Sequence, residues 1–151
     1  MALEHRISEL DTYLFAKGTH YEIYEKMGAH LAEEDGKAGT YFSVWAPNAR
    51  SVSVVGDFNN WDRSAHPMQP VQQSGIWDIF VPGVKAGDLY KFAVETSQGY
   101  TVLKADPYGN QSQLRPDNAS VVADIRHFDW TDQAWRKAHQ EKKTESPMAI
   151  Y

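Results

Sequence analysis

A chain of 151 residues with 42% hydrophobic content can form one domain of about 100–150 residues, with a true core and flanking segments. The net charge is −5 and no run of Lys and Arg exceeds a pair, which argues against a nucleic-acid partner. The absence of cysteine excludes disulfides and thiolate metal sites, and no uncharged apolar run approaches the ~18 residues of a membrane span, so we expect no membrane partner.

The first part of the chain, residues 1–39, predicts a helical extension followed by a linker. Its apolar residues recur at near-helical spacing and Gly18 ends the pattern: Leu3, Ile7, Leu10 and Leu14. The stretch LAEEDGKAGT (31–40) is polar and contains glycine, so we interpret it as the linker into the main domain. Charged residues interrupt the first fifteen positions, which excludes the apolar core of a signal peptide and favours a cytoplasmic location.

The middle part, residues 40–124, has the pattern of short strands separated by turns. The predicted strands are 40–46, 51–55, 75–81, 88–95, 100–104 and 119–124. In the third, Trp77, Ile79 and Val81 share one face. Strands at roughly 10-residue spacing predict an all-β fold, an immunoglobulin-like β-sandwich without the cysteine pair.

The last part, residues 125–151, changes pattern again. TDQAWRKAHQEKK (131–143) begins with a threonine cap and is rich in helix formers, so it predicts a linker helix. An apolar run then begins, and we expect a further strand to start at Met148 and to lead into a domain beyond this chain.

No group of residues predicts catalysis, a metal site or a cofactor. The aspartates of the middle part, among them Asp57 and Asp78, lie in predicted turns or on a strand face that we expect to be solvated. The six histidines form no zinc-binding pattern, and Asp57-Phe58-Asn59 fails as a calcium loop because Trp61 occupies its fifth position.

The turn after the second predicted strand combines aromatic and polar side chains. Its sequence is GDFNNWD (56–62), with Trp61 two residues after Asn59 and next to Asn60. Lys91 lies opposite the apolar face of its strand, and Tyr100 follows a glycine at a strand start. Aromatic rings with amide and ammonium groups suit an uncharged, hydroxyl-rich ligand. Equally, Trp61 could cover the end of the sandwich while Lys91 is a solvated cation.

A series of motifs in one order carries a family resemblance: YFSVWAPNARSVSVVGDFNNWD (41–62), GIWDIFVPG (75–83), LYKFAV (89–94) and KADPYG (104–109). The series resembles the carbohydrate-binding module of family 48, which precedes the catalytic barrel in the α-amylase superfamily. THYEIYEKMGAH (19–30) makes the chain similar to the N-terminal part of bacterial 1,4-α-glucan (glycogen) branching enzymes, and PMAIY (147–151) resembles their entry into the barrel.

The resemblance implies a non-catalytic domain in glycogen biosynthesis. Its partners would be an α-1,4-glucan, such as glycogen or maltooligosaccharides, and the catalytic barrel of the same enzyme. The family's transfer of a glucan segment to a 6-hydroxyl uses carboxylates on later barrel strands, so no catalytic residue is carried over to this chain.

For the binding residues, the resemblance implies sugar contacts for the Trp of the NNW turn and the Lys of the YKF strand, here Trp61 and Lys91. The family's second binding Trp falls near Tyr100, where this chain departs from the pattern. Two rival functions stay open: a purely structural module without sugar contact, and a regulatory glycogen-targeting domain. Debranching and trehalose-forming relatives share the module, but residues 19–30 favour branching enzymes.

Overall fold

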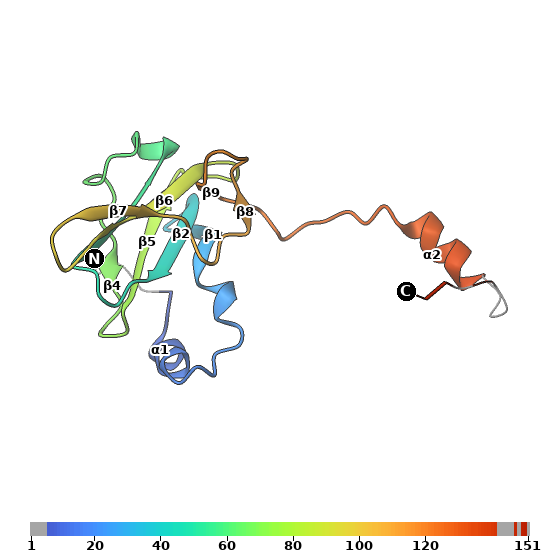
Figure 1. Cartoon of the computed structure of the whole chain (residues 1–151), viewed down its shortest axis with the longest axis horizontal. Helices are drawn as coiled ribbons and strands as arrows, with labels where there is room; N and C mark the ends of the chain where they lie inside the picture. The colour runs from blue at the N-terminus through green and yellow to red at the C-terminus, as the bar shows by residue number, and fades with distance from the viewer. Residues whose placement is uncertain (1–5, 142–146, 148, 151) are drawn as a thin grey trace.

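The computed structural model describes residues 6–141, 147, 149 and 150, and its strands form two antiparallel sheets packed face to face (Figure 1). In chain order the elements are α1 (Glu9–Ala16), a 3-10 turn (Ile23–Glu25), β1 (Gly28–Glu34), β2 (Lys37–Trp45), β3 (Ser51–Gly56), a second 3-10 turn (Asp57–Asn59), β4 (Gln69–Pro70), β5 (Ile76–Pro82), β6 (Leu89–Glu95), β7 (Thr101–Lys104), β8 (Gln111–Ser112), β9 (Ser120–Val121) and α2 (Gln133–Gln140).

Two sheets make up the sandwich. Sheet A has the strand order β1-β2-β5-β4. Sheet B has the order β3-β6-β9-β8, and β7 also pairs with β6. The connections from β2 to β3, from β3 to β4 and from β5 to β6 cross from one sheet to the other, as in immunoglobulin-like sandwiches. The prediction of an all-β sandwich is confirmed.

The core between the sheets is formed by alternate residues of the central strands. Phe42 of β2, Val54 of β3 and Phe92 of β6 are completely buried there. The faces predicted from alternation agree with this arrangement, since Trp77 and Ile79 pack against the same cluster. Because successive residues of a strand point to opposite faces, the same strands present polar residues outward.

The N-terminal extension covers the outer side of sheet A and creates a second core. This cluster joins the segment around α1 to β5: Ile7, Ile23, Met27, Val71 and Ile76. Phe15 of α1 also meets the ring of Trp45 edge-on at 5.9 Å. The extension is therefore a third layer of the domain, and Figure 1 shows α1 beside the two sheets.

This third layer explains why β2 is buried on both faces. Tyr41 points away from the central core, and its hydroxyl donates a hydrogen bond to Asp78 of β5. Ser43, on the same side, donates to the carbonyl oxygen of Lys26 at 2.7 Å. The expectation that Asp78 is solvated is wrong, because the extension covers this face and leaves the residue 3% exposed.

The interpretation of residues 31–40 as a linker is also wrong. These residues belong to a hairpin in which β1 pairs with β2 along its whole length, from Gly28 opposite Ser43 to Glu34 opposite Lys37. Asp35 and Gly36 form the turn, both with positive φ. The segment is polar because β1 is an edge strand, so its sequence lacks the apolar alternation by which inner strands are recognised.

The C-terminal part leaves the sandwich after Val122 and ends in α2, which stands apart from the sheets in Figure 1. The predicted linker helix is present over Gln133–Gln140, and none of its residues is buried. The expected strand from Met148 lies at positions of which the structure describes only Ala149 and Ile150. No helix in the described part of the chain is long and apolar enough to cross a bilayer.

A buried carboxylate fixes α1 to the rest of the extension. Asp11 is 6% exposed and accepts hydrogen bonds from Ser8, from His20 Nε2 at 2.7 Å and from Lys26 Nζ at 2.5 Å. Burial alone would raise the pKa of Asp11, but the bonds from Lys26, His20 and Ser8 outweigh it and hold the pKa well below its usual range.

The hairpin and the exposed C-terminal part predict where a protease cuts. We expect trypsin to cleave first at Arg126, Arg136 or Lys137, because this region lacks buried contacts, while Lys37 in β2 is protected by strand pairing. Mass spectrometry of early fragments checks this order. Early cleavage at Lys91 inside β6 would contradict the sandwich.

The Asp11 cluster predicts a pH-dependent stability. We expect Asp11→Asn to lower the free energy of unfolding by about 2 kcal/mol at pH 7, because a buried charged acceptor is lost. The folded-state pKa lies below the unfolded value of about 3.9, so this stabilisation is present above that pH and is lost as the pH falls below it. Urea unfolding of wild type and variant at pH 7 and pH 3 measures it, with the exposed Asp129→Asn as control. An equal difference at both pH values would exclude an ionised Asp11 as the cause.

Candidate functional site

The turn after β3 is closed by one asparagine side chain. Asn59 accepts a hydrogen bond from the backbone N–H of Gly56 and donates one to the carbonyl of Val54, both at 3.0 Å. It is 9% exposed, so its amide is committed to the fold. Gly56 is required here because a Cβ would lie 2.1 Å from the carbonyl oxygen of Leu89.

The two aromatics of this turn have opposite orientations. Phe58 packs on Phe42 with ring centroids 6.0 Å apart and so belongs to the core. Trp61 is 36% exposed, and its indole N–H donates to Asp57 Oδ1 at 3.1 Å. Asn60 and Trp61 both have positive φ, 53° and 59°. A left-handed backbone at a bulky residue is rare and costs energy, of the order of 1–3 kcal/mol, so this conformation is held in place by the surrounding bonds.

Lys91 lies beside this turn on the outside of sheet B. Lys91 pairs with Val55 of β3. The next residue of β3, Gly56, accepts a hydrogen bond from the backbone N–H of Trp61 through its carbonyl oxygen, at 3.0 Å. Lys91 Nζ donates to the side-chain oxygen of Asn118 at 2.6 Å. The structure therefore brings Trp61, Lys91 and Asn118 to one end of sheet B. Sequence reasoning missed Asn118, because its contact with Lys91 spans 27 residues.

Tyr100 lies at the other end of the sheet. Its carbonyl accepts the backbone N–H of Thr96 at 2.9 Å, in the turn that joins β6 to β7. Thr96 is five residues from Lys91, about 17 Å along a strand. Tyr100 is 55% exposed, but the structure does not bring it together with Trp61 and Lys91.

The residue of β7 that comes nearest to Lys91 on this surface is Leu103. It pairs with Ala93 of β6, two positions from Lys91 and on the same face, and is 43% exposed. Sequence reasoning missed Leu103 because the turn from Thr96 to Gly99 sets the register between β6 and β7. This register cannot be inferred from the position of Tyr100 in the sequence. We use the name "outer face of sheet B" for the outward residues of the three adjacent strands: Ser51, Ser53, Val55, Lys91, Ala93, Glu95, Thr101 and Leu103.

The buried carboxylates of the domain serve the fold. Asp106 accepts a hydrogen bond from the Tyr90 hydroxyl at 2.6 Å, and burial raises the pKa of both groups. Asp78 is paired with Tyr41 on the far side of sheet A. These acids do not face each other across an open cleft, as the hydrolysis or transfer of a sugar bond requires. Among the residues that the structure describes, no group of three or more His, Asp and Glu side chains could hold a metal ion.

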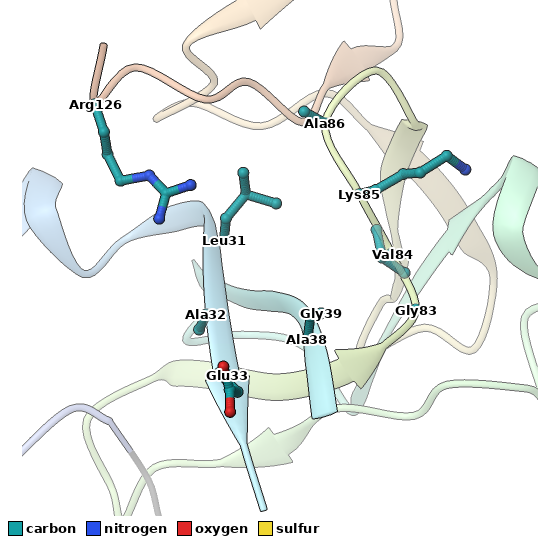
Figure 2. A pocket seen from close by; sticks show the side chains of 10 residues that line it. All are labelled: Leu31, Ala32, Glu33, Ala38, Gly39, Gly83, Val84, Lys85, Ala86 and Arg126. Carbon is teal, nitrogen blue, oxygen red and sulfur yellow. The ribbon is translucent and has the colours of Figure 1, made fainter. Parts of the chain in front are cut away.

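A hollow lies between the β1–β2 hairpin and the loop of residues 83–86, with a volume of about 430 Å³. Figure 2 shows Leu31, Ala38 and Val84 along its walls and the Arg126 side chain reaching toward Leu31. Both of its cations are already paired, Arg126 with Asp124 at 2.6 Å and Lys85 with Asp88 at 3.5 Å. Glu33 adds one carboxylate to a lining that is otherwise mostly apolar, and a lining of this kind suits contact with a polypeptide better than with a sugar.

Comparisons with known proteins agree with these features. Residues 26–109 match the family described as carbohydrate-binding module 48 (isoamylase N-terminal domain). The chain is 50% identical over 146 residues to the 1,4-alpha-glucan branching enzyme GlgB of Synechococcus sp. (strain CC9605), and 51% identical over 146 residues to that of Butyrivibrio fibrisolvens. Each match covers 96% of this chain but only 19% and 23% of the relatives.

Solved structures share the fold. A Klebsiella pneumoniae pullulanase complexed with maltotriose superposes with a TM-score of 0.55 and 28% identity, over 78% of this chain and 11% of that chain. The pullulanase of Klebsiella oxytoca gives a TM-score of 0.52 and 30% identity over 67% of this chain and 10% of its own. Since the family match spans more than half of the sequence and includes β1 to β7, the chain belongs to the carbohydrate-binding module 48 family.

Proposed function

We propose that this chain is the non-catalytic N-terminal module of a cytoplasmic 1,4-α-glucan branching enzyme and that it binds α-1,4-glucan on sheet B. The observation that carries the binding proposal is the exposed ring of Trp61 at the same end of the sheet as Lys91 and Asn118. The enzyme class rests on relatives named 1,4-alpha-glucan branching enzyme, of which this chain spans about a fifth.

The chemistry of this surface suits a neutral sugar. A pyranose ring has an apolar face that can stack on Trp61, while Lys91 Nζ and the Asn118 amide supply donors and an acceptor for hydroxyls. Asn60 is exposed next to the ring and can reach the same ligand. We assign Asn59 a positioning role, because its amide is already used in closing the turn.

Tyr100 lies too far from Lys91 to contact the same sugar ring in this proposal. Its separation from Lys91 places it outside a contact with one or two sugar rings, so only a longer glucan would reach it. Leu103 offers an exposed apolar surface closer to Lys91 and extends the platform in its place.

A second function is favoured by exposed aromatics in the C-terminal part. Phe128, Trp130 and Trp135 are each more than 60% exposed, and the rings of Phe128 and Trp130 meet at 4.9 Å. Large exposed apolar groups of this kind mark interfaces. We propose that they pack, together with the hollow lined by Leu31 and Arg126, against the catalytic domain of the longer enzyme.

The proposed platform predicts a loss of binding when the ring is removed. We expect wild type to bind maltoheptaose with a Kd of the order of 1 mM, and Trp61→Ala to weaken this about tenfold, because stacking is the largest apolar contact. Amide chemical shifts in a titration report both affinity and fold. Trp135→Ala, an exposed ring remote from sheet B, is the matched control.

The same titration compares the contribution of Lys91 to binding with that of Trp61. Lys91→Ala should weaken binding only about threefold, because a hydrated ammonium gains little by exchanging water for hydroxyls. Unchanged affinity of a folded Trp61→Ala would refute the platform. If wild type fails to bind at tens of millimolar, the purely structural function stands instead.

The assignment of the carboxylates predicts that this chain alone has no branching activity. Asp78 and Asp106 are held by tyrosine hydroxyls inside the domain and cannot act on a glucan. Incubation with amylose followed by analysis of α-1,6 linkages should show none above a blank. Formation of branches in proportion to the concentration of this chain would contradict the proposal.

A further inference from the structure

A polar hollow lies on the outer face of sheet B, beyond the Trp61 and Lys91 surface. Its volume is about 230 Å³, and residues of three strands and one loop line it. Ser51 and Ser53 of β3, Ala93 and Glu95 of β6 and Thr101 of β7 form the floor, and Arg63 and Ser64 form the wall. The wall comes from the same loop as Trp61, two residues further along the chain.

The hollow and Lys91 are neighbours along β6, above Val55 and Ala93, which are themselves buried. Ala93 is the next outward residue of β6 after Lys91, so the two are about 7 Å apart along the strand. Ser53 pairs with Ala93, as Val55 pairs with Lys91. A linear ligand that starts on Trp61 and runs parallel to β6 would therefore pass over Lys91 and enter the hollow.

Several polar groups that line the hollow have unused hydrogen-bonding capacity. The Arg63 guanidinium and the hydroxyls of Ser53 and Thr101 make no hydrogen bond or ion pair with any residue that the structure describes. Glu95 accepts only the Ser51 hydroxyl, at 2.6 Å through Oε2, which leaves Oε1 without a donor in the described part of the chain. Polar groups around a hollow of this size are ordinarily satisfied by a ligand or by water.

The mixture of groups selects the class of ligand. A guanidinium donates only, a carboxylate accepts only, and the serine and threonine hydroxyls do both. A phosphate would be repelled by Glu95, and an ammonium by Arg63. A neutral polyhydroxylated ring satisfies both, because its hydroxyls donate to Glu95 and accept from Arg63.

We propose that this hollow is an extension subsite for further glucosyl units of the α-glucan that binds on Trp61. The proposal rests on the proposed function and deepens it: the outer face of sheet B discriminates between short and long chains. Short oligosaccharides occupy the Trp61 and Lys91 end alone, whereas longer ones gain additional hydrogen bonds in the hollow.

The test compares two sugars on the 151-residue chain. Arg63→Met removes the guanidinium but keeps the aliphatic stem, and Thr101→Val removes a hydroxyl without changing shape. We expect Arg63→Met to weaken maltoheptaose binding about fivefold and to leave maltotriose within about twofold of wild type. Arg136→Met, an exposed arginine on α2, is the matched control and should change neither.

Amide shifts of the wild type give an independent reading. Maltoheptaose should shift the amides of Ser53, Ala93 and Thr101, and maltotriose should shift only those around Trp61 and Lys91. Wild-type affinity of Arg63→Met and Thr101→Val for maltoheptaose would overturn the subsite while leaving the Trp61 platform intact. Equal weakening of both sugars would overturn the division into two parts. Failure of wild type to bind either sugar would overturn the proposed function and the subsite together.

Discussion

The pairing of β6 with its neighbours is the constraint on which the rest of the structure depends. This strand pairs with β3 on one side and with β7 and β9 on the other. Tyr90, Phe92 and Val94 point into the core, while Lys91 and Ala93 point out. A slip of one residue would place Lys91 in the core and Phe92 in water, so the burial of the aromatics fixes the register. The position of the candidate site is thus set by the hydrophobic core beneath it.

The turn after β3 likewise links a buried aromatic residue to an exposed one. Phe58 holds the turn to Phe42, and Asn59 binds the end of β3 from within, so the next residues have no freedom to fold inward. Trp61 is thereby held at the surface in a left-handed conformation that a tryptophan would not adopt unaided. Backbone strain maintained by its surroundings is typical of functional positions, which is physical support for a platform and against a mere plug.

The inner strands could be predicted from the sequence because alternation is a local signal. Trp77, Ile79 and Val81 reveal the inward face of β5 without knowledge of its partners. The burial of the opposite face of β5 could not be predicted from alternation. Asp78 reads as solvated until the N-terminal extension is found to cover it, since burial depends on a segment some fifty residues earlier. The edge strand β1 was missed for a related reason: an edge strand buries little, so its sequence need not alternate.

For the candidate site, the resemblance identified Trp61 and Lys91, and the structure places them at one end of sheet B. Tyr100 shows the limit of transferring a position by sequence neighbourhood. The turn between β6 and β7 extends to Gly99, so Tyr100 lies at the end of sheet B that is distant from Lys91. The same register places Leu103 opposite Ala93. Asn118 and Arg63 could not be found either, because the first reaches the site from near β9 and the second from a loop whose path depends on Asn59.

The proposed glucan-binding face is polar, and the proposal requires it to select its ligand without a deep pocket. The core faces of β3 and β6 supply the stability, so the outward positions of these strands can carry Ser53 and Glu95 without loss of packing, and the loop after Trp61 adds Arg63. An exposed hydrogen bond is worth little alone, since water competes for each group. In the proposed function, several such groups held on a rigid sheet would act together on a ligand that is itself a line of repeated hydroxyls. Affinity would then grow with the length of the ligand, and a surface without a deep pocket could still distinguish a polymer from its fragments.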